Sequence, residues 1–507
     1  MTTLISLMVA AAVQVSAALV LAAPAPALAR DGAAPASGAT ALAPVVTRHT
    51  LALPDRRLAY RALAETLPIT SDRGETTARV AVIAYLAQGA PPATRPVTFV
   101  FNGGPGASSA YLHLGALGPR VLATNPDGSL PTPPARLRGN PDSWLAFTDL
   151  VFIDPVGTGF SRAAKPGDEA ERRFWSVSGD VASLAEVIRL WLTRTARWAS
   201  PKFLAGESYG GFRAARLARA LLADPGVGLN GLVLISPALE FSTLAPGAHA
   251  VLPWALALPS LVAAARAHGR GDPTLSLTEV ERFALSEYLT GIAAIAPAGP
   301  GPEPALIARL AGLLGLDEEV VRRHHGRIPA RVFAERLLEG TGRALSLYDG
   351  ARAGPDPHPG RGGGPDPQLE ATRAAFATAY NAYVRDELQL ATDLPFRLLN
   401  ERTAREWDWE GARGGRGGSG GALDELAEAL ALTPGLGVLV VHGRTDLVTP
   451  YLASRWLLDR LDLPEEVRGR VRLEVLGGGH MMYLRPAERR ALTELAAEFY
   501  RRRAPVT

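Results

Sequence analysis

Three residues of the types that cooperate in nucleophilic catalysis each follow a short apolar stretch: Ser208, Asp446 and His480. A serine hydroxyl becomes a nucleophile when an imidazole takes its proton and a carboxylate orients that imidazole. The residues occur in the chain order Ser, Asp, His, and His480 is the one histidine that follows Asp446. They predict a triad for acyl transfer, with Ser208 as nucleophile, His480 as general base and then acid, and Asp446 as the group that orients the imidazole.

The serine stands in the segment GESYGG at 206–211, between a strand expected at 201–205 and a helix expected at 212–222. A Gly-x-Ser-x-Gly turn in this context exposes the serine on a tight bend, and its glycines let the strand and the helix pack closely. The bend also places the backbone N–H of Tyr209 at a helix N-terminus, where it can donate to a developing oxyanion.

A second glycine-rich turn, NGGPGASS at 102–109, follows an apolar strand expected at 95–101. Consecutive glycines leave backbone N–H groups open to a ligand, so Gly104 is expected to supply the other half of the oxyanion hole.

Each of these features has an ordinary explanation when it stands alone. Ser208 could be an incidental residue of a glycine-rich turn, Asp446 a helix cap or turn residue, and His480 an exposed loop histidine. Their joint placement after strands, in the order that a triad requires, favours catalysis.

The elements that must position these residues alternate between strands and helices. Strands are expected at 78–86, 95–101, 201–205, 229–235, 435–443 and 472–476, and the stretch 149–161 is expected to be a further buried strand that ends in a glycine-rich turn. Helices are expected at 181–197, 212–222 and about 486–502. This alternation predicts an α/β protein with a mostly parallel central sheet flanked by helices, the α/β-hydrolase fold. The alternation fades in the Ala- and Leu-rich region 241–425, which is expected to be a large, mainly helical cap insertion that shapes the substrate pocket.

The predicted organisation is a core in two parts with an insertion between them. In chain order it consists of a signal peptide at 1–29, a disordered linker at 30–45, the first part of the core at 46–240, the cap at 241–425 and the second part of the core at 426–507.

The composition narrows the classes of function. The chain has 507 residues, of which 47% are hydrophobic and 20% charged, as in globular proteins with a sizeable core. It has no cysteine, which excludes disulfides and a thiol nucleophile. The formal net charge is only +3 and no basic tract is present, so no nucleic-acid partner is predicted. The pair His324-His325 lacks metal-ligand spacing, and neither a metal nor another cofactor is predicted.

An apolar run at 5–23 is followed by Ala27-Leu28-Ala29 and then by Arg30. Such a run ahead of an Ala-x-Ala site predicts a secretory signal cut after Ala29. The mature protein is then expected in the periplasm or outside the cell, with no stable membrane association. No Lys or Arg precedes the run, so an uncleaved N-terminal membrane anchor is the alternative.

Four motifs together resemble those of the serine carboxypeptidase family, in the same order. They are NGGPGASS at 102–109, DPVGTGFS at 154–161, GESYGG at 206–211 and GHM at 479–481. The matching blocks cover roughly 80–240 and 430–490, and four ordered motifs are far more specific than any one of them. The cap resembles that of bacterial members through Tyr348-Asp349 and through WDW at 407–409.

The resemblance implies a secreted exopeptidase that releases the C-terminal residue of a peptide through an acyl-enzyme intermediate. In that family the glutamate before the serine and the asparagine of the glycine-rich loop bind the free carboxylate of the substrate. Here these residues are Glu207 and Asn102, together with the N–H of Gly103. Two close carboxylates cannot both ionise cheaply, so Glu207 must share a proton with the substrate, and activity is expected to be best at acidic pH. The expected partner is a peptide with a free C-terminus.

The chain departs from the well-known eukaryotic members within this carboxylate-binding network. Those members carry a tryptophan where this chain has Val100 and a glutamate where it has Ala116. One hypothesis is that His113 or Arg120 compensates by placing positive charge nearby. The alternative is that both residues serve packing or the surface.

Two further interpretations of the sequence stay open. An acyltransferase, an esterase or an aminopeptidase could use the same triad. These activities stay open because the carboxylate-binding network is reduced. A binding protein built on a hydrolase scaffold is the non-enzymatic alternative, against which the intact triad argues.

Overall fold

The computed structural model describes residues 41–504 except 166, 245–249, 295–300, 360, 362 and 410–419. The signal peptide expected at 1–29 and most of the linker expected at 30–45 lie outside the described residues. The described residues all belong to one unit, Gly38–Thr507.

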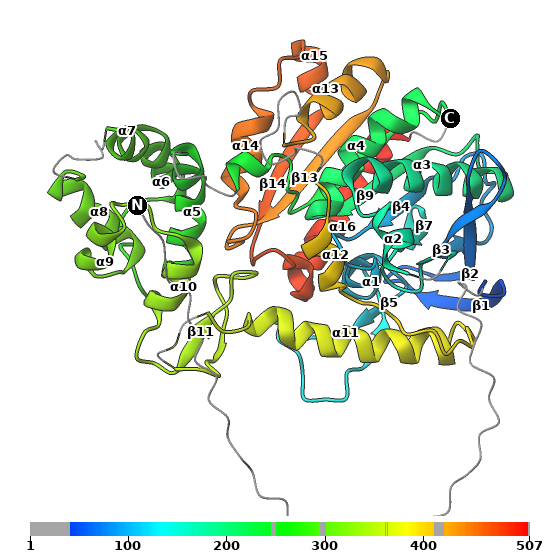
Figure 1. Ribbon diagram of the computed structural model, residues 1–507, viewed down its shortest axis with the longest axis horizontal. Helices are drawn as coiled ribbons and strands as arrows, with labels where there is room; N and C mark the ends of the chain where they lie inside the picture. The colour runs from blue at the N-terminus through cyan, green and yellow to red at the C-terminus, as the bar shows by residue number, and fades with distance from the viewer. Residues whose placement is uncertain are drawn as a thin grey trace, which may run out of the picture. The chain divides into compact units, whose positions relative to one another are not determined.

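A ten-stranded sheet forms the centre of the described part of the chain (Figure 1). In their order across the sheet, its strands are β1 (Val45–Ala52), β2 (Arg57–Thr70), β3 (Thr76–Ala87), β7 (Asp149–Ile153), β4 (Val97–Phe101), β9 (Lys202–Glu207), β10 (Gly231–Ile235), β13 (Gly437–Gly443) and β14 (Val471–Leu476), while β8 (Arg162–Ala163) pairs with β3. The strands from β7 to β14 are parallel to one another, and β1, β2 and β3 extend the sheet in antiparallel pairs. The predicted α/β-hydrolase fold with a mainly parallel sheet is confirmed.

The central strands are buried along their whole length. Every residue of β4, β7, β9, β10 and β13 is buried, and most of these residues are apolar. A parallel sheet needs this composition because helices cover both of its faces and exclude water from both sets of side chains.

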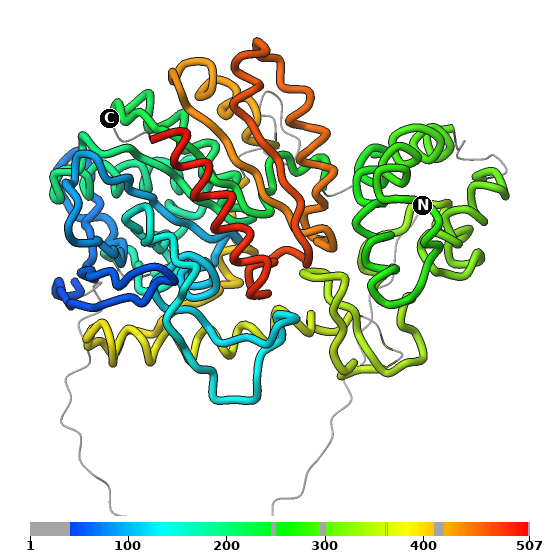
Figure 2. The backbone as a smooth tube through the Cα atoms, turned by 180° about the vertical axis from the view of Figure 1, so that it is seen from behind, coloured from blue at the N-terminus to red at the C-terminus, as the bar shows by residue number. Residues whose placement is uncertain are grey.

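Helices cover the two faces of the sheet with separate hydrophobic clusters. On one face lie α3 (Val177–Arg194), α4 (Tyr209–Ala223) and α13 (Leu423–Leu432). On the other lies α16 (Pro486–Arg503), and α11 (Pro367–Asp386), which runs below the sheet in Figure 1, packs its buried residues into the same cluster. α3 and α4 lie in front of the sheet in Figure 1, and α16 lies in front of it in the reverse view of Figure 2. Alternate residues of the central strands enter the two clusters, as the two-residue period of a strand requires.

The inserted region contains two kinds of element. The helices α5 (Leu252–Ala267), α6 (Leu277–Phe283), α7 (Leu289–Ala293), α8 (Pro304–Leu314), α9 (Glu318–Arg323) and α10 (Ala330–Leu337) share a hydrophobic cluster of their own with the strand β11 (Arg343–Leu345), which pairs with β12 (Ala353–Pro355). The long helix α11 instead packs into the sheet cluster through Phe376, Tyr380 and Tyr383. One part of the insertion therefore forms a separate lobe and another part belongs to the core.

Shorter elements complete the described chain. They are α1 (Ala110–Leu112), the π-helical turn η1 (His113–Leu117), β5 (Arg120–Leu122), β6 (Leu137–Gly139), η2 (Trp144–Ala146), α2 (Asp168–Arg172), η3 (Phe241–Thr243), η4 (Ala284–Tyr288), α12 (Glu401–Glu406), α14 (Tyr451–Leu458), α15 (Glu465–Arg468) and η5 (Met482–Leu484).

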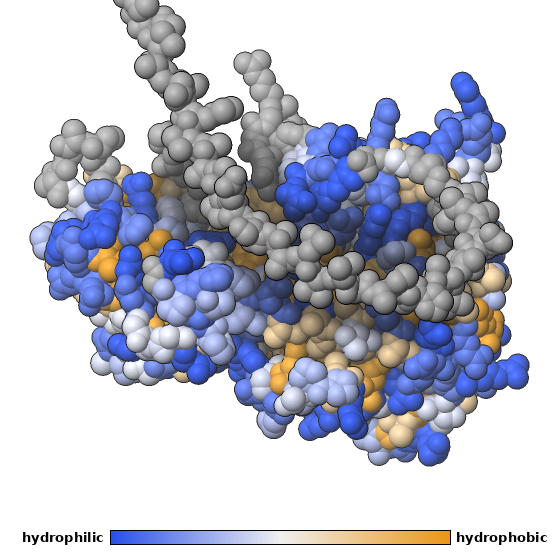
Figure 3. All heavy atoms as spheres, turned by 60° about the horizontal axis from the view of Figure 1, so that its bottom comes forward, coloured by the Kyte–Doolittle hydropathy of each residue, from blue (hydrophilic) through white to orange (hydrophobic). Residues whose placement is uncertain are grey.

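One face of the molecule shows mainly hydrophilic residues. Figure 3 shows polar and charged side chains over much of one face, with hydrophobic residues in scattered groups between them. Val46, Trp198 and Leu432 are the large hydrophobic side chains that stand exposed among the described residues. Of the helices described, none has both the length and the apolar character needed to cross a membrane.

A buried ion pair connects the helix after Ser208 to the glycine-rich loop. Arg213 Nε lies 2.6 Å from Asp180 Oδ2, and both side chains are almost completely buried. The guanidinium also donates to the carbonyl oxygen of Asn102 at 2.6 Å. Asp180 and Arg213 thereby couple α3 and α4 to the start of the loop at 102–109.

Arg213→Met is expected to lower the free energy of unfolding by about 3–5 kcal/mol, because it leaves the buried Asp180 carboxylate without its cation. Denaturant unfolding of the wild type and the variant measures this loss. The double variant Asp180→Leu/Arg213→Met is the matched control. It removes both charges, so we expect it to recover much of the lost stability; equal destabilisation by the double variant would contradict the ion-pair explanation.

Candidate active site

Ser208 stands at the bend between β9 and α4 and is half-buried. Its φ of 60° and ψ of −125° lie in a region that residues other than glycine rarely adopt, as is found at strained functional turns. A Cβ at Gly206 would collide with the carbonyl oxygen of Gly210, so the strand and the helix approach this closely because both positions are glycine. The sequence motif thus folds as the expected tight turn, with Ser208 at its tip.

Asp446 and His480 contact each other although they lie on different loops. His480 Nδ1 is 2.8 Å from Asp446 Oδ2, and both side chains are buried. The other oxygen, Oδ1, accepts the backbone N–H groups of Val448 and Thr449 at 2.8 and 2.9 Å, and Thr449 Oγ1 donates to Oδ2 at 2.6 Å. With the carboxylate on Nδ1, that nitrogen carries the proton and Nε2 is the basic nitrogen of the ring.

Asp446 and His480 each stabilise the charged form of the other. Burial alone would raise the pKa of Asp446, but the imidazole of His480 and the hydrogen bonds from His480 and Thr449 bring it below its usual value. Burial alone would lower the pKa of His480, but the Asp446 carboxylate raises it above its usual value. Asp446 therefore remains ionised and stabilises an imidazolium on His480.

Ser236 joins the backbone of the serine turn to that of the histidine loop. Ser208 N–H donates to the carbonyl oxygen of Ile235 at 3.0 Å, and the next residue, Ser236, donates from Oγ to the carbonyl oxygen of His480 at 3.0 Å. No hydrogen bond joins Ser208 Oγ to His480 Nε2 within the described residues, and this contact is often long when no substrate is bound. The three candidate triad residues thus follow the carboxyl ends of strands in one parallel sheet.

The glycine-rich loop lies directly against the serine turn. A Cβ at Gly103 would come within 2.7 Å of the Tyr209 nitrogen and 2.8 Å of Ser208 Cβ, so only glycine fits there. Tyr209 is the first residue of α4, and its N–H therefore has no acceptor inside the helix. Gly104 follows with a φ of 102°, a conformation that glycine adopts freely. These neighbours of Ser208 are the expected oxyanion donors, and the assignment of Gly104 and Tyr209 stays a prediction.

Glu207 is buried between two hydrogen-bond donors. Asn102 Nδ2 donates to Oε2, and the Tyr483 hydroxyl lies 3.0 Å from Oε1 and 2.8 Å from Oε2. Asn102 is itself fixed, because its Oδ1 accepts the N–H of Leu112 at 2.9 Å. Burial raises the pKa of Glu207 to about 7, although His480 and the two donors oppose the shift. The carboxyl group therefore keeps its proton below neutral pH and can donate a hydrogen bond there.

The hypothesis that His113 or Arg120 supplies positive charge to this network is wrong. His113 is fully buried with Nε2 2.7 Å from the Tyr85 hydroxyl, and burial lowers its pKa to about 3, so the ring is neutral. Arg120 forms an ion pair with Glu387, with 2.8 Å between Nε and Oε2. Both residues lie shortly after the glycine-rich loop in the sequence, but this proximity to Asn102 did not predict contact with Glu207.

Sequence reasoning missed three residues that contact the candidate site. Thr449 hydrogen-bonds the Asp446 carboxylate, Ser236 hydrogen-bonds the histidine loop, and Tyr483 hydrogen-bonds Glu207. Thr449 could have been found from its position three residues after Asp446, because a capping aspartate commonly accepts the backbone N–H three residues on. Tyr483 likewise follows His480 by three residues, but its partner is distant in sequence and no local signal identifies it.

The insertion reaches the histidine loop through Tyr348 and Asp349. His480 N–H donates to the carbonyl oxygen of Tyr348 at 2.5 Å, and the Tyr348 ring stands edge-on to the imidazole with 5.4 Å between ring centres. Asp349 accepts hydrogen bonds from Thr445 Oγ1 at 2.5 Å and from Arg485 at 2.6 Å. The segment therefore braces both loops that carry the Asp–His pair.

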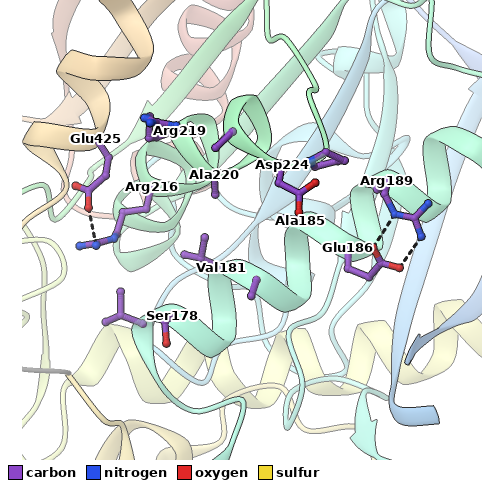
Figure 4. A pocket seen from close by; sticks show the side chains of 14 residues that line it. Ser178, Val181, Ala185, Glu186, Arg189, Arg216, Arg219, Ala220, Asp224 and Glu425 are labelled. Atoms are coloured by element: carbon purple, nitrogen blue, oxygen red, sulfur yellow. Dashed lines mark hydrogen bonds and ion pairs between the residues drawn. The ribbon is translucent and has the colours of Figure 1, made fainter. Parts of the chain in front are cut away.

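A groove on the surface between α3 and α4 is separate from this site (Figure 4). Val181, Ala185 and Ala220 contribute to its apolar lining, and Figure 4 shows the ion pair between Glu186 and Arg189 along one part of it. None of the candidate site residues lines the groove. Within the described residues, no group of three His, Asp or Glu side chains is placed to hold a metal ion.

Comparison with known proteins gives partial matches. The chain is similar to serine carboxypeptidase-like 28 of Arabidopsis thaliana, 31% identical over 162 residues that cover 30% of this chain and 32% of that protein. It is also similar to the lysosomal protective protein of Mus musculus, 30% identical over 146 residues that cover 28% of each chain. The chain thus matches only about a third of the length of these relatives.

Among solved structures, a peroxisomal alpha-beta-hydrolase from Saccharomyces cerevisiae aligns with 13% identity and a TM-score of 0.37, over 92% of this chain and 89% of that one. The fold assignment rests on the strand order described above and takes nothing from this likeness.

The profile of the serine carboxypeptidase family matches residues 84–243. The matched segment contains the glycine-rich loop, the motif at 154–161 and the serine turn. The structure places the glycine-rich loop against Ser208 and Glu207 through Gly103 and Asn102. Over this segment, about a third of the chain, the protein is similar to the serine carboxypeptidase family.

Proposed function

We propose that this protein is a serine carboxypeptidase that releases the C-terminal residue of a peptide. The observation that carries the proposal is the position of Glu207, a buried carboxyl group next to Ser208 whose pKa is raised to about 7. A protonated carboxyl group beside the nucleophile can hydrogen-bond a substrate carboxylate, whereas an ionised one would repel it. An endopeptidase has no use for such a group, because its substrates carry no charge next to the cleaved bond.

The first chemical step forms the acyl-enzyme. Ser208 Oγ attacks the carbonyl carbon of the last peptide bond while His480 Nε2 takes the hydroxyl proton. The N–H groups of Gly104 and Tyr209 stabilise the oxyanion of the tetrahedral intermediate. The C–N bond then breaks, the C-terminal amino acid leaves with the proton from His480, and an ester joins the shortened peptide to Ser208.

The second step hydrolyses this ester. Water attacks the acyl carbon and gives a proton to His480 Nε2, and the new tetrahedral intermediate uses the same two N–H donors. When it collapses, His480 returns the proton to Ser208 Oγ and the shortened peptide leaves as a carboxylic acid. Asp446 stays ionised throughout and stabilises the imidazolium in both halves of the reaction.

The free C-terminal carboxylate of the substrate is bound by Glu207, Asn102 and the N–H of Gly103. Asn102 and Glu207 are hydrogen-bonded to each other, and Gly103 lies against the Ser208 turn, so all three groups are neighbours of the nucleophile. A substrate carboxylate bound by protonated Glu207 would place the last peptide bond next to Ser208. Because substrate binding requires the protonated form of Glu207, activity is expected to be higher at acidic pH.

The ratio of kcat/KM for an N-blocked dipeptide to kcat/KM for its C-terminal amide is expected to fall as pH rises through about 7. Both substrates need neutral His480, so its titration cancels in the ratio. Only the free acid needs protonated Glu207, which is lost as pH rises through its pKa. Initial rates for both substrates from pH 4 to 9 measure the ratio.

Glu207→Gln is the matched variant for this experiment, because the amide keeps the shape and can donate a hydrogen bond at every pH. We expect its ratio to be independent of pH. A wild-type ratio that stays flat across the same range would contradict the role of Glu207. Turnover of esters alone would favour the esterase alternative.

The proposal also includes export of the protein after cleavage of an N-terminal signal peptide. The apolar run at 5–23 and the Ala-x-Ala site before Arg30 support cleavage after Ala29 and a periplasmic or extracellular location. N-terminal sequencing of the protein recovered from the producing cells tests it. A mature chain that begins at Arg30 is the expected result, and retention of residues 1–29 in the membrane fraction would support the anchor instead.

A further inference from the structure

The Tyr483 hydroxyl is directed at the carboxyl group of Glu207. Its oxygen lies within 3.0 Å of both carboxyl oxygens, and the whole side chain is buried. Tyr483 belongs to the short helical turn η5, three residues after His480. The residue therefore connects the loop that carries the general base to the group proposed to read the substrate carboxylate.

Gly115 provides the space for the Tyr483 ring. A Cβ at Gly115 would lie 2.7 Å from Cε2 and 3.1 Å from Cδ2 of Tyr483, and 3.2 Å from Cζ of Phe376. The φ of Gly115 is not among the positive values, so its backbone in η1 does not require glycine. The packing of the tyrosine ring is what requires it. Neighbouring Ala116 is small and buried and adds no polar group.

We infer that Tyr483 is a positioning residue for Glu207, held in place through the space left by Gly115, and that it sets how this carboxyl group meets the C-terminal carboxylate of a peptide. The inference rests on the proposed carboxypeptidase activity and identifies a determinant of its specificity for free C-termini. With Asn102 on one side and Tyr483 on the other, Glu207 is held by two neutral donors.

The other groups that face Glu207 do not replace this contact. Tyr111 and Tyr348 influence its electrostatic surroundings, but burial raises both of their pKa values and they stay neutral in the working range. His480 and Asp446 are the charged neighbours, of opposite sign and paired with each other. In the described part of the chain, none of these four groups donates a hydrogen bond to the carboxyl group of Glu207, whereas Tyr483 does.

The contact has two consequences for the recognition step. A hydroxyl that donates to the ionised carboxylate stabilises it, so Tyr483 opposes the effect of burial on the pKa of Glu207. The same hydrogen bond limits rotation of the carboxyl group and so keeps its orientation toward a bound substrate. Loss of the hydroxyl should therefore change both the pH dependence and the binding of free acids, and leave amide substrates unaffected.

Tyr483→Phe tests these consequences, because it removes the hydroxyl and keeps the ring against Gly115. We expect the midpoint of the acid-to-amide ratio to move up by about one pH unit, the size of one hydrogen bond to a charged group. KM for the N-blocked dipeptide should rise about tenfold, with kcat/KM for its amide changed by less than about twofold. A residue that only supported the fold would alter both substrates alike.

Gly115→Ala should disturb the same hydrogen bond in another way, because the added Cβ displaces the Tyr483 ring. We expect it to move the ratio in the same direction as Tyr483→Phe. The double variant should change the ratio no further than the larger single effect, because both substitutions act on one hydrogen bond. Additive changes would contradict the shared mechanism.

Tyr500→Phe is the matched control for loss of a buried tyrosine hydroxyl. Tyr500 is bonded to Thr98 at 2.7 Å, away from the candidate site, so we expect an unchanged ratio at every pH. Thermal unfolding of all variants shows whether each is folded at the assay temperature.

Infrared spectroscopy gives a readout that does not depend on activity. The C=O band of the protonated Glu207 carboxyl, identified by its loss in Glu207→Gln, should titrate near pH 7 in the wild type. The band should titrate about one pH unit higher in Tyr483→Phe. If the wild type shows no preference for free acids, the proposed function fails while the infrared shift still reports on the Tyr483–Glu207 contact. If the wild type shows the preference but neither the ratio nor the band moves in Tyr483→Phe, the inference is overturned.

Discussion

Ser208→Ala is expected to lower kcat for an N-blocked dipeptide by about 10⁵-fold or more, because it removes the atom that forms the acyl-enzyme. The oxyanion donors and the carboxylate-binding groups remain, so a small activity above the uncatalysed rate should persist. Fluorophosphonate labelling, measured as a mass increase of the intact protein, should also disappear. The loss should be confined to chemistry, because alanine places only its Cβ at the same strained turn.

Ser260→Ala is the control for this experiment. Ser260 is buried in α5, and its hydroxyl has no hydrogen-bond partner among the described residues, so its loss should leave kcat and labelling close to those of the wild type. A Ser208→Ala protein that keeps a tenth or more of the wild-type rate would exclude Ser208 as the nucleophile.

Asp446→Asn is expected to lower kcat/KM by about 10³–10⁴-fold with little change of fold. In the wild type, Asp446 Oδ1 accepts two backbone N–H groups and Oδ2 faces His480 Nδ1. An asparagine must keep its carbonyl oxygen toward the backbone donors, which turns its NH₂ group toward His480. Nδ1 must then accept a hydrogen bond, the proton moves to Nε2, and the ring can no longer act as a base toward Ser208.

Asp127→Asn provides the comparison for Asp446→Asn. Asp127 is exposed in a loop and accepts hydrogen bonds from Ser129, and we expect its substitution to change kcat/KM by less than about twofold. The proton position in Asp446→Asn can be followed by the ¹⁵N shifts of the His480 ring. A ring that still carries its proton on Nδ1, with activity near that of the wild type, would remove Asp446 from the triad.

The elements that carry the candidate triad could be predicted because their signals are local. An apolar strand that ends in glycine and serine identifies the turn at Ser208. A fully buried strand, β13, precedes Asp446, and a half-buried strand, β14, precedes His480. Parallel strands in one sheet bring their carboxyl ends to one edge, so chain order and strand assignment suffice to place the three residues together.

The surroundings of Glu207 could not be predicted in this way because they depend on tertiary contacts. The sequence suggested His113 and Arg120 by their nearness to the glycine-rich loop, but His113 is bonded to Tyr85 and Arg120 to Glu387. The contact that does form joins Glu207 to Tyr483, which follows it by more than 270 positions. No periodicity or spacing connects two such residues.

In the insertion, the sequence indicates helices but does not show which part of the molecule each helix packs against. Its Ala- and Leu-rich composition indicated helices, and α11 is one of those that the region contains. Whether a helix joins a separate lobe or the sheet depends on which partner buries its aromatic residues. The sequence of α11 alone does not identify the sheet cluster in which Phe376 and Tyr380 lie.

The most direct test of the central claim is digestion of an N-acetylated peptide and of the same peptide with a C-terminal amide, followed by mass spectrometry at pH 5. The account predicts that the free acid loses single residues from its C-terminus in succession, that the amide is cut far more slowly, and that Ser208→Ala cuts neither. Cleavage at internal bonds, or equal cleavage of acid and amide, would contradict recognition of the C-terminal carboxylate through protonated Glu207.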